Sequence, residues 1–181
     1  QFASPSFDAS VSEIFVTLAA GAALCLPATG DDSDRDDVPR ALRMASATHV
    51  TMPPSLLATL SPAELSRLKA LIVAGEAGSA ELFHRFSSCC RVINAYGPTE
   101  ATVCGSMKIM TPDVELPTLG SPLAGAELYL LNAALESVPV GVPGEVYIGT
   151  AGSHGLARGY LRATDVTATS FVPHPFATHS G

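Results

Sequence analysis

The N-terminal half of the chain alternates short apolar runs with segments whose apolar residues recur at helical spacing. This alternation is typical of βαβ units and predicts a parallel sheet. The runs predict strands at Ala22–Leu26, His49–Met52, Ala70–Val73 and Val92–Ala95. Ligands bind at the carboxyl ends of the strands in open α/β sheets, so the residues that follow these runs are the first candidates for a site.

Two helix starts can be recognised between these strands. Ser61 is followed by proline and, three residues on, by glutamate, which is the pattern of a capped helix start. Ser79 is expected to cap the next helix. The apolar residues of that second helix predict its buried face, namely Leu82, Phe83 and Phe86.

In the C-terminal part, proline and glycine separate short runs in which apolar and polar residues alternate. Glu127–Leu131 and Glu145–Ile148 are runs of this kind and predict antiparallel hairpins. Phe171–Phe176 contains prolines, which cannot donate ladder hydrogen bonds, so a loop or a sheet edge is predicted there. The predicted fold class is α/β, with a flavodoxin-like parallel βα core in residues 1–110 and part of a small antiparallel β-subdomain in residues 111–181.

Composition narrows the possible partners. A chain of 181 residues with 47% hydrophobic content is long enough to bury one sizeable core. Its formal charge of -7 argues against nucleic acid or an anionic membrane as partner. The acidic run Asp31–Asp37 is interpreted as a solvated loop, because it lacks the glycine and terminal glutamate of a Ca²⁺ loop. Four cysteines without zinc-type spacing and the lack of a membrane-length apolar run make the cytoplasm the expected location.

A dense group of polar residues follows the last predicted strand, where residues 94–100 read Asn-Ala-Tyr-Gly-Pro-Thr-Glu. Asn94 could bond an adenine edge and Tyr96 could stack on the base. Thr99 could donate to a phosphate, and Glu100 could hold a hard cation such as Mg²⁺. From these residues alone, a strand-to-helix turn capped by Thr99 is the alternative interpretation.

This run resembles a motif of the adenylate-forming enzymes, specifically of the amino-acid adenylation domains of nonribosomal peptide synthetases. Phe7–Phe15 is similar to the helix motif on the substrate-carboxyl side in that family. Gly144–Gly149 together with Gly155–Tyr160 is similar to its later glycine-rich motif. The three motifs occur in the order of the family, and the resemblance extends from Phe2 to Phe176.

The resemblance implies an ATP-dependent ligase. In this family an amino-acid carboxylate attacks the α-phosphate of ATP, and the aminoacyl group is then loaded onto the phosphopantetheine thiol of a peptidyl carrier protein. By similarity, Glu100 would help to coordinate Mg²⁺ and Thr99 would contact the adenylate phosphate, which makes these two the predicted catalytic residues. The predicted residues around the adenine are Asn94, Tyr96, Gly75, Glu76 and Ala77.

The resemblance also implies a pocket for the amino acid. Asp8 would pair with the α-ammonium of the substrate, with a helix N-cap carboxylate as the alternative. Because the other positions are small or apolar, an aromatic substrate is expected, either tyrosine or a substituted phenylalanine. Phenylalanine-activating relatives often have tryptophan where Ser12 stands. The predicted substrate-binding residues are Asp8, Ala9, Ser12, Thr51, Ile72, Ala74, Ala95, Val103 and Cys104.

Several features of the family have no counterpart in this sequence. The phosphate-loop lysine, the ribose-binding aspartate and the lysine-bearing C-terminal subdomain are absent, so the chain is interpreted as an internal fragment that is inactive without the remainder of the adenylation domain. Residues 149–155 form a longer connection than is usual. Two alternatives stay open, namely a fragment of an acyl- or aryl-CoA ligase and a non-catalytic folding or swap module.

Overall fold

The computed structural model describes residues 1–26, 37–113, 115–150 and 155–176. The chain divides into two compact units. One comprises Gln1–Tyr96 with Met107–Ser121 and is called the sheet unit, and the other comprises Gly97–Ser106 with Pro122–Gly181 and is called the hairpin unit. Most of the predicted acidic loop and the tip of the long connection, residues 151–154, lie outside the described residues.

A five-stranded sheet has the order β1-β2-β3-β4-β5. The first three strands are parallel, and Val50 of β1 is in register with Leu71 of β2, which is in register with Val92 of β3. Two predicted strands are confirmed to the residue, and the third is one residue longer at each end than predicted. The bounds are β1 His49–Met52, β2 Ala70–Val73, β3 Arg91–Tyr96, β4 Ser106–Met110 and β5 Ser121–Pro122.

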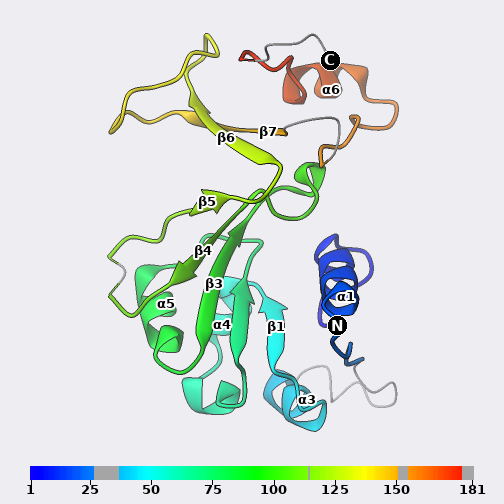
Figure 1. Ribbon diagram of the computed structural model, residues 1–181, viewed down its shortest axis with the longest axis vertical. Helices are drawn as coiled ribbons and strands as arrows, with labels where there is room; N and C mark the ends of the chain where they lie inside the picture. The colour runs from blue at the N-terminus through cyan, green and yellow to red at the C-terminus, as the bar shows by residue number, and fades with distance from the viewer. Residues whose placement is uncertain (27–36, 114, 151–154, 177–181) are drawn as a thin grey trace. The chain divides into compact units, whose positions relative to one another are not determined.

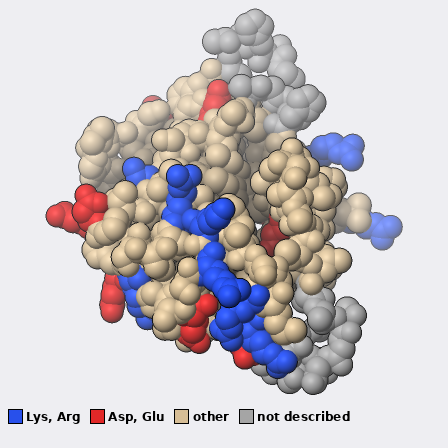
Figure 2. All heavy atoms as spheres, turned by 60° about the horizontal axis from the view of Figure 1, so that its bottom comes forward, with Lys and Arg blue, Asp and Glu red and all other residues tan. Residues whose placement is uncertain are grey.

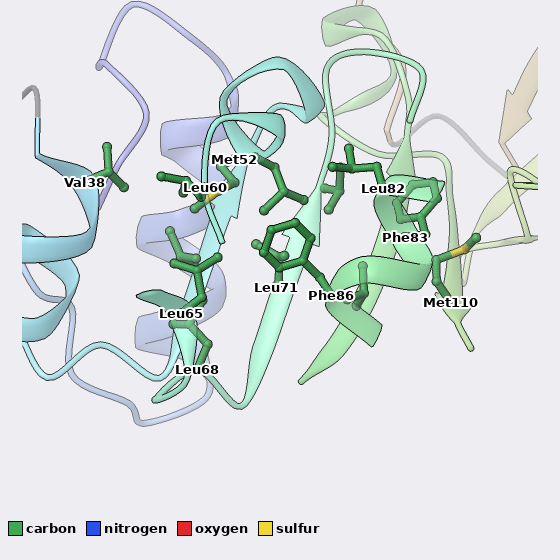
Figure 3. Close-up of a cluster of buried hydrophobic side chains, with 14 residues drawn as sticks. Val38, Met52, Leu60, Leu65, Leu68, Leu71, Leu82, Phe83, Phe86 and Met110 are labelled. Atoms are coloured by element: carbon green, nitrogen blue, oxygen red, sulfur yellow. The ribbon is translucent and has the colours of Figure 1, made fainter. Parts of the chain in front are cut away.

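One face of the parallel strands packs against helices (Figure 1). Because parallel strands are joined by right-handed crossovers and the strand order does not reverse, successive connections lie on the same face. Side chains from this face and from the helices form one buried apolar cluster, in which Leu71 and Phe86 are fully buried (Figure 3). The connecting elements are α3 Val38–Met44, α4 Pro54–Ala58, the 3₁₀ turn η1 Pro62–Leu65 and α5 Ala80–Ser87.

Both predicted helix starts are confirmed. The Ser79 hydroxyl accepts a hydrogen bond from Leu82 N at 3.1 Å, and the three apolar side chains assigned to the buried face of α5 are buried. Ser61 N and Ser61 Oγ both donate to Glu64 Oε2 at 2.7 Å. The helix that follows Ser61 is a single 3₁₀ turn.

The predicted strand at Ala22–Leu26 is wrong. Helix α1, Ala9–Ala19, ends just before Gly21, whose φ of +66° lies in the left-handed region that favours glycine. No strand is formed by residues 22–26, and Leu26 is 67% exposed. The run consists of alanine, leucine and cysteine without any β-branched residue, so its preference for a strand is weak.

The hairpin unit contains the predicted antiparallel pair. Strands β6, Ala126–Leu131, and β7, Glu145–Thr150, pair with Tyr129 opposite Tyr147. The segment 171–176 forms no strand, as predicted. The 3₁₀ turn η2, Thr99–Ala101, and helix α6, Thr164–Ser170, complete the unit. No helix in the described part of the chain is long and apolar enough to cross a membrane.

Candidate functional site

The carboxyl ends of β2 and β3 carry the first group of predicted residues. The turn Gly75–Ala77 follows β2, and Asn94 and Tyr96 belong to the last residues of β3. The amino ends differ, since Lys69 directly precedes β2 and Arg91 begins β3. Figure 2 shows a band of basic side chains on the face that the lower side of Figure 1 presents. The strand ends that carry the predicted residues therefore differ in charge from the opposite ends.

The predicted pocket residues of the sheet share one face. Thr51 is in register with Ile72, and Ile72 is in register with Ile93. Because side chains alternate along a strand, these three face away from the buried cluster, and Ala95 follows Ile93 on the same face. Thr51 and Ile72 are half-buried. The parallel register thus places the predicted wall residues together on the face that the crossovers leave open.

Helix α1 carries Asp8, Ala9 and Ser12. Asp8 occupies the N-cap position with φ -61° and ψ -27°, but its side chain makes no capping hydrogen bond. Residues separated by three or four positions lie on the same side of a helix, so Asp8 and Ser12 are neighbours. All three residues are half-buried. The carboxylate that was predicted to bind an ammonium group is therefore not used as a cap.

Asn94 is 9% exposed and has a fixed side chain. Its Nδ2 donates to the carbonyl oxygen of Thr118 at 2.9 Å. With the donor engaged, Oδ1 is the atom that can accept a hydrogen bond. An acceptor in this place suits an exocyclic amino group such as that of adenine.

The turn after β2 is anchored to α4. Glu76 accepts hydrogen bonds from Ser55 N at 3.0 Å and from Ser55 Oγ at 2.9 Å. A carboxylate is favourable there because the first backbone N–H groups of a helix lack partners within it. Gly75 has φ +90°, and a Cβ added to it would meet no atom within 4 Å. Because the Glu76 side chain is engaged by Ser55, only the backbone and the small residues of this turn can face a base. The sequence did not show that Glu76 has this other partner.

In the hairpin unit, the loop after β3 folds back on itself closely. A Cβ on Gly97 would lie 2.6 Å from Gly105 N and 2.7 Å from the Cα of Cys104, so only glycine fits. Thr102 and Val103 both have left-handed backbone, with φ 55° and 71°. This conformation is strained for β-branched residues and is typical of positions that the surrounding structure must hold.

Glu100 lies in η2 and is bound twice by a distant segment. Ala157 N donates to Glu100 O at 2.7 Å, and the hydroxyl of Tyr160 donates to Glu100 Oε1 at 2.5 Å. The hydrogen bond from Tyr160 lowers the pKa of Glu100 below its ordinary value. The same bond raises the pKa of Tyr160, because the phenol is better paired with the carboxylate when it keeps its proton. Glu100 is therefore held as a half-buried carboxylate.

Val103 and Cys104 follow Thr102, the residue after η2, and are half-buried. None of the four cysteines forms a disulfide. Burial raises the pKa of Cys90 to about 12, so that thiol stays protonated.

In the described ranges, no group of three or more histidine, cysteine, aspartate or glutamate side chains could hold a metal ion. Any cation at Glu100 would need most of its ligands from a bound molecule.

The predicted residues thus fall into two groups. The sheet unit carries the residues expected around the ammonium and the adenine and most of those expected around the side chain. The hairpin unit carries Thr99 and Glu100, together with the two remaining side-chain residues, Val103 and Cys104. Sequence reasoning did not predict the contact of Tyr160 with Glu100, although Tyr160 ends one of the three motifs. The glycine-rich motif that ends at Tyr160 was the feature of the sequence that could have indicated a role for this residue.

Comparisons with known proteins agree with this architecture. The family described as AMP-binding enzyme matches residues 1–161. One linear gramicidin synthase polypeptide of Brevibacillus parabrevis is 46% identical over 178 residues, covering 98% of this chain and 3% of that protein. Novobiocin biosynthesis protein H of Streptomyces niveus is 45% identical, covering 98% of this chain and 29% of that protein. The solved structure of PA1221, an NRPS protein containing adenylation and PCP domains, superposes with a TM-score of 0.80 at 26% identity over 97% of this chain and 37% of that one.

The chain therefore belongs to the AMP-binding enzymes, a family of adenylate-forming ligases. Within that family it corresponds to part of the adenylation domain of a nonribosomal peptide synthetase. The chain spans less than a third of the length of the two relatives compared.

Proposed function

We propose that this chain is the part of an adenylation domain that selects an aromatic amino acid, tyrosine or a substituted phenylalanine, and contributes to ATP binding. The reaction is attack of the amino-acid carboxylate on the α-phosphate of ATP, which forms the aminoacyl-adenylate as the bond to pyrophosphate breaks. Transfer to the phosphopantetheine thiol of a carrier protein follows. PA1221, which contains both an adenylation and a PCP domain, supports that partner.

The observation that carries the proposal is the uncapped carboxylate of Asp8. An aspartate at an N-cap position ordinarily accepts a hydrogen bond from its own helix. Asp8 does not, and no hydrogen bond of its side chain occurs within the described ranges. A half-buried carboxylate without a partner is costly unless a ligand pairs with it. The α-ammonium of an amino acid is a cation of suitable charge and size.

The aromatic preference rests on side-chain size. Ala9, Ser12 and Ala95 take up little volume, and Ile72 supplies an apolar surface. Small residues together with an apolar surface leave room for a large, mostly apolar side chain. The Ser12 hydroxyl adds one polar group, which favours a substrate with a ring substituent over phenylalanine.

The nucleotide is assigned to the strand ends and to η2. Asn94 Oδ1 accepts from the adenine amino group, while Tyr96 and the backbone of the Gly75–Ala77 turn contact the base. The Thr99 hydroxyl contacts the phosphate. Glu100 fits a magnesium site because one carboxylate, completed by phosphate oxygens and water, is the usual protein contribution to Mg²⁺. When bound, Mg²⁺ neutralises charge that would otherwise oppose the approach of two anions.

The remainder of the adenylation domain is a proposed partner of α1. Phe7, Phe15, Val16 and Leu18 are exposed on or next to this helix, and Phe15 is 67% exposed. Contiguous exposed apolar side chains of this size mark surfaces that bind other protein elements. Because the chain covers only 37% of PA1221, the remainder of such a domain is available to bury them.

ATP–pyrophosphate exchange over a panel of amino acids tests the proposal in an adenylation domain that carries this chain. We expect tyrosine or ring-substituted phenylalanines to give the highest kcat/KM. Asp8→Ala should lower kcat/KM by roughly two to four decades, since removal of one partner of a buried charge pair costs about 3–5 kcal/mol.

Asp37→Ala is the matched control. Asp37 Oδ1 accepts from Arg40 N at 2.9 Å, so this aspartate does cap its helix, α3. Its removal should lower stability by about 1 kcal/mol and leave amino-acid selection unchanged. If Asp8→Ala behaves like Asp37→Ala, the ammonium role is wrong. If aliphatic amino acids are activated best, the aromatic assignment is wrong.

A further inference from the structure

The segment Gly155–Tyr160 holds η2 and the residue after it at three points. Ala157 N donates to the Glu100 carbonyl oxygen at 2.7 Å, and the Tyr160 hydroxyl donates to Glu100 Oε1 at 2.5 Å. The Thr102 hydroxyl donates to Gly155 O at 2.7 Å. Tyr160 is sixty residues away from Glu100 in the sequence, so this contact is made by the fold of the hairpin unit. Both the backbone and the carboxylate of Glu100 are thus bound by one segment.

Tyr160 is itself fixed independently of Glu100. Gly159 has φ +132°, and a Cβ there would overlap the side chain of Thr167 on α6. This close approach lets Tyr160 N donate to the Thr167 hydroxyl at 2.9 Å. The Tyr160 ring packs edge-on against Phe171, with centroids 5.6 Å apart and an interplanar angle of 70°. The phenol is therefore aimed by glycine geometry and ring packing before it meets the carboxylate.

The short bond to Glu100 Oε1 has a chemical consequence. An O–H donor to a carboxylate forms one of the stronger hydrogen bonds in proteins, and it restrains rotation of the carboxylate plane. One oxygen is then occupied, while Oε2 accepts no hydrogen bond from another described residue. Because Oε1 is occupied and the carboxylate plane is restrained, Oε2 is the oxygen left to bind a ligand, and its direction is set.

We propose that Tyr160 is a positioning residue, which orients Glu100 so that Oε2 serves as the metal-directed oxygen. This inference rests on the proposed function of Glu100 as a ligand of nucleotide-bound Mg²⁺. It gives a role to the glycine-rich motif at Gly155–Tyr160, which the proposed chemistry otherwise leaves unexplained. Gly159 and Thr167 act indirectly, because they set the position of Tyr160.

The proposal can be tested without turnover in an adenylation domain that carries this chain. Mn²⁺ replaces Mg²⁺, and its binding is measured in the complex of that domain with a non-hydrolysable ATP analogue. Loss of the free-ion EPR signal gives the dissociation constant. Tyr160→Phe should weaken Mn²⁺ binding about tenfold or more, which corresponds to the loss of one hydrogen bond to a charged group. In pyrophosphate exchange, the half-saturating Mg²⁺ concentration should rise by a similar factor, with little change in KM for the amino acid.

Thr102→Val is the matched control, because it removes another hydrogen bond between the same two segments without touching the carboxylate. It should leave Mn²⁺ binding unchanged. Equal weakening by Tyr160→Phe and Thr102→Val would overturn the proposal in favour of a general structural role. If Tyr160→Phe fails to fold, Phe171→Leu carries the test, since it removes the ring that supports Tyr160 and should also weaken Mn²⁺ binding.

Glu100→Ala separates failure of this inference from failure of the proposed function. If Glu100→Ala leaves Mn²⁺ binding unchanged, Glu100 is not a metal ligand and both proposals fail. If Glu100→Ala weakens binding while Tyr160→Phe does not, only the positioning role of Tyr160 is overturned. The proposal also requires that Tyr160→Phe has no further effect once Glu100 is alanine. An additive effect in the double variant would show that Tyr160 acts by another route.

Discussion

The sheet unit contains all 14 side chains of the main buried apolar cluster, whereas the hairpin unit is held mainly by hydrogen bonds and ring contacts. In the described residues of the hairpin unit, the buried apolar side chains are Ala101 and Leu131. Hydrogen bonds join several of its other side chains. Tyr129 donates to Glu127 at 2.9 Å, and His174 Nε2 lies 3.0 Å from the same carboxylate.

This difference matches the chemistry proposed for each unit. Selection of an amino-acid side chain requires walls of fixed shape, and a sheet with one densely packed face provides them. Orientation of a carboxylate requires specific donors, and the hairpin unit supplies one in Tyr160. The sheet unit should therefore respond mainly to changes of volume, and the hairpin unit to changes of polar groups and pH.

The largest expected effect is on the core of the sheet unit. Phe86 is fully buried in the main cluster, so Phe86→Ala should lower the free energy of unfolding by about 3–5 kcal/mol, measured by urea unfolding of this chain. Phe15→Ala is the matched control, since Phe15 is 67% exposed and its truncation leaves no cavity. Comparable losses from both variants would contradict the assignment of the core.

Pocket shape should be sensitive to Ser12. In an adenylation domain that carries this chain, Ser12→Trp fills the space proposed for a ring substituent, and overpacking of this kind costs about 1–3 kcal/mol. The ratio of kcat/KM for tyrosine to that for phenylalanine should fall by about tenfold or more. Ser66→Trp makes the same exchange at an exposed serine and should leave the ratio unchanged. A constant ratio in Ser12→Trp would remove Ser12 from the pocket.

Substitution of two buried serines by alanine should change the free energy of unfolding by a smaller amount, with opposite signs in the two units. Ser106 Oγ, in the hairpin unit, is buried without a hydrogen-bond partner among the described residues. Ser10 Oγ, in the sheet unit, donates to Phe7 O at 2.7 Å. Ser106→Ala should raise the free energy of unfolding by about 1 kcal/mol, and Ser10→Ala should lower it by a similar amount. Thermal unfolding of both variants tests this, and destabilisation by Ser106→Ala would reveal a missing partner.

The sequence predicted best what depends on local pattern. The strands at His49–Met52 and Ala70–Val73 were located to the residue. Ala70–Val73 is a continuous apolar run, which is typical of a buried parallel strand, and in His49–Met52 the apolar residues alternate with polar ones. Ala22–Leu26 has the same apolar character but no β-branched residue, and it forms no strand. Hydrophobicity alone therefore does not distinguish a strand from an apolar connection.

Contacts between distant side chains could not be predicted in this way. Glu76 was assigned to the adenine turn, but its carboxylate binds Ser55, twenty-one residues earlier. Tyr160 reaches Glu100 across sixty residues. Such pairs depend on how separate elements meet in space, and the spacing of residues along the chain carries no information about that. Residue types at the site were predictable, but their partners were not.

The smallest expected effect concerns the pH dependence of the hairpin unit. The hydrogen bond from His174 and, to a smaller extent, the one from Tyr129 lower the pKa of Glu127 below its ordinary value. A carboxylate with a lowered pKa in the folded state stabilises that state fully above its unfolded pKa of about 4.3, and the contribution is lost as the pH falls through the folded value. The contacts of the Tyr129 ring with His174 and Phe176 should therefore loosen below about pH 4.

NMR signals of the Tyr129 and Phe176 rings, followed from neutral to acidic pH, measure this loosening directly. Glu127→Gln should remove the acid-induced change, because the amide does not titrate. Glu145→Gln is the matched control, since it removes the same charge from the partner strand β7 and should leave the transition in place. If both variants keep the transition, another group controls it, and the hairpin unit is less dependent on polar contacts than its sparse core suggests. If only Glu127→Gln abolishes the transition, the carboxylate of Glu127 is the group that binds the segment around His174 to β6. The hairpin unit then depends on a polar contact where the sheet unit depends on apolar packing.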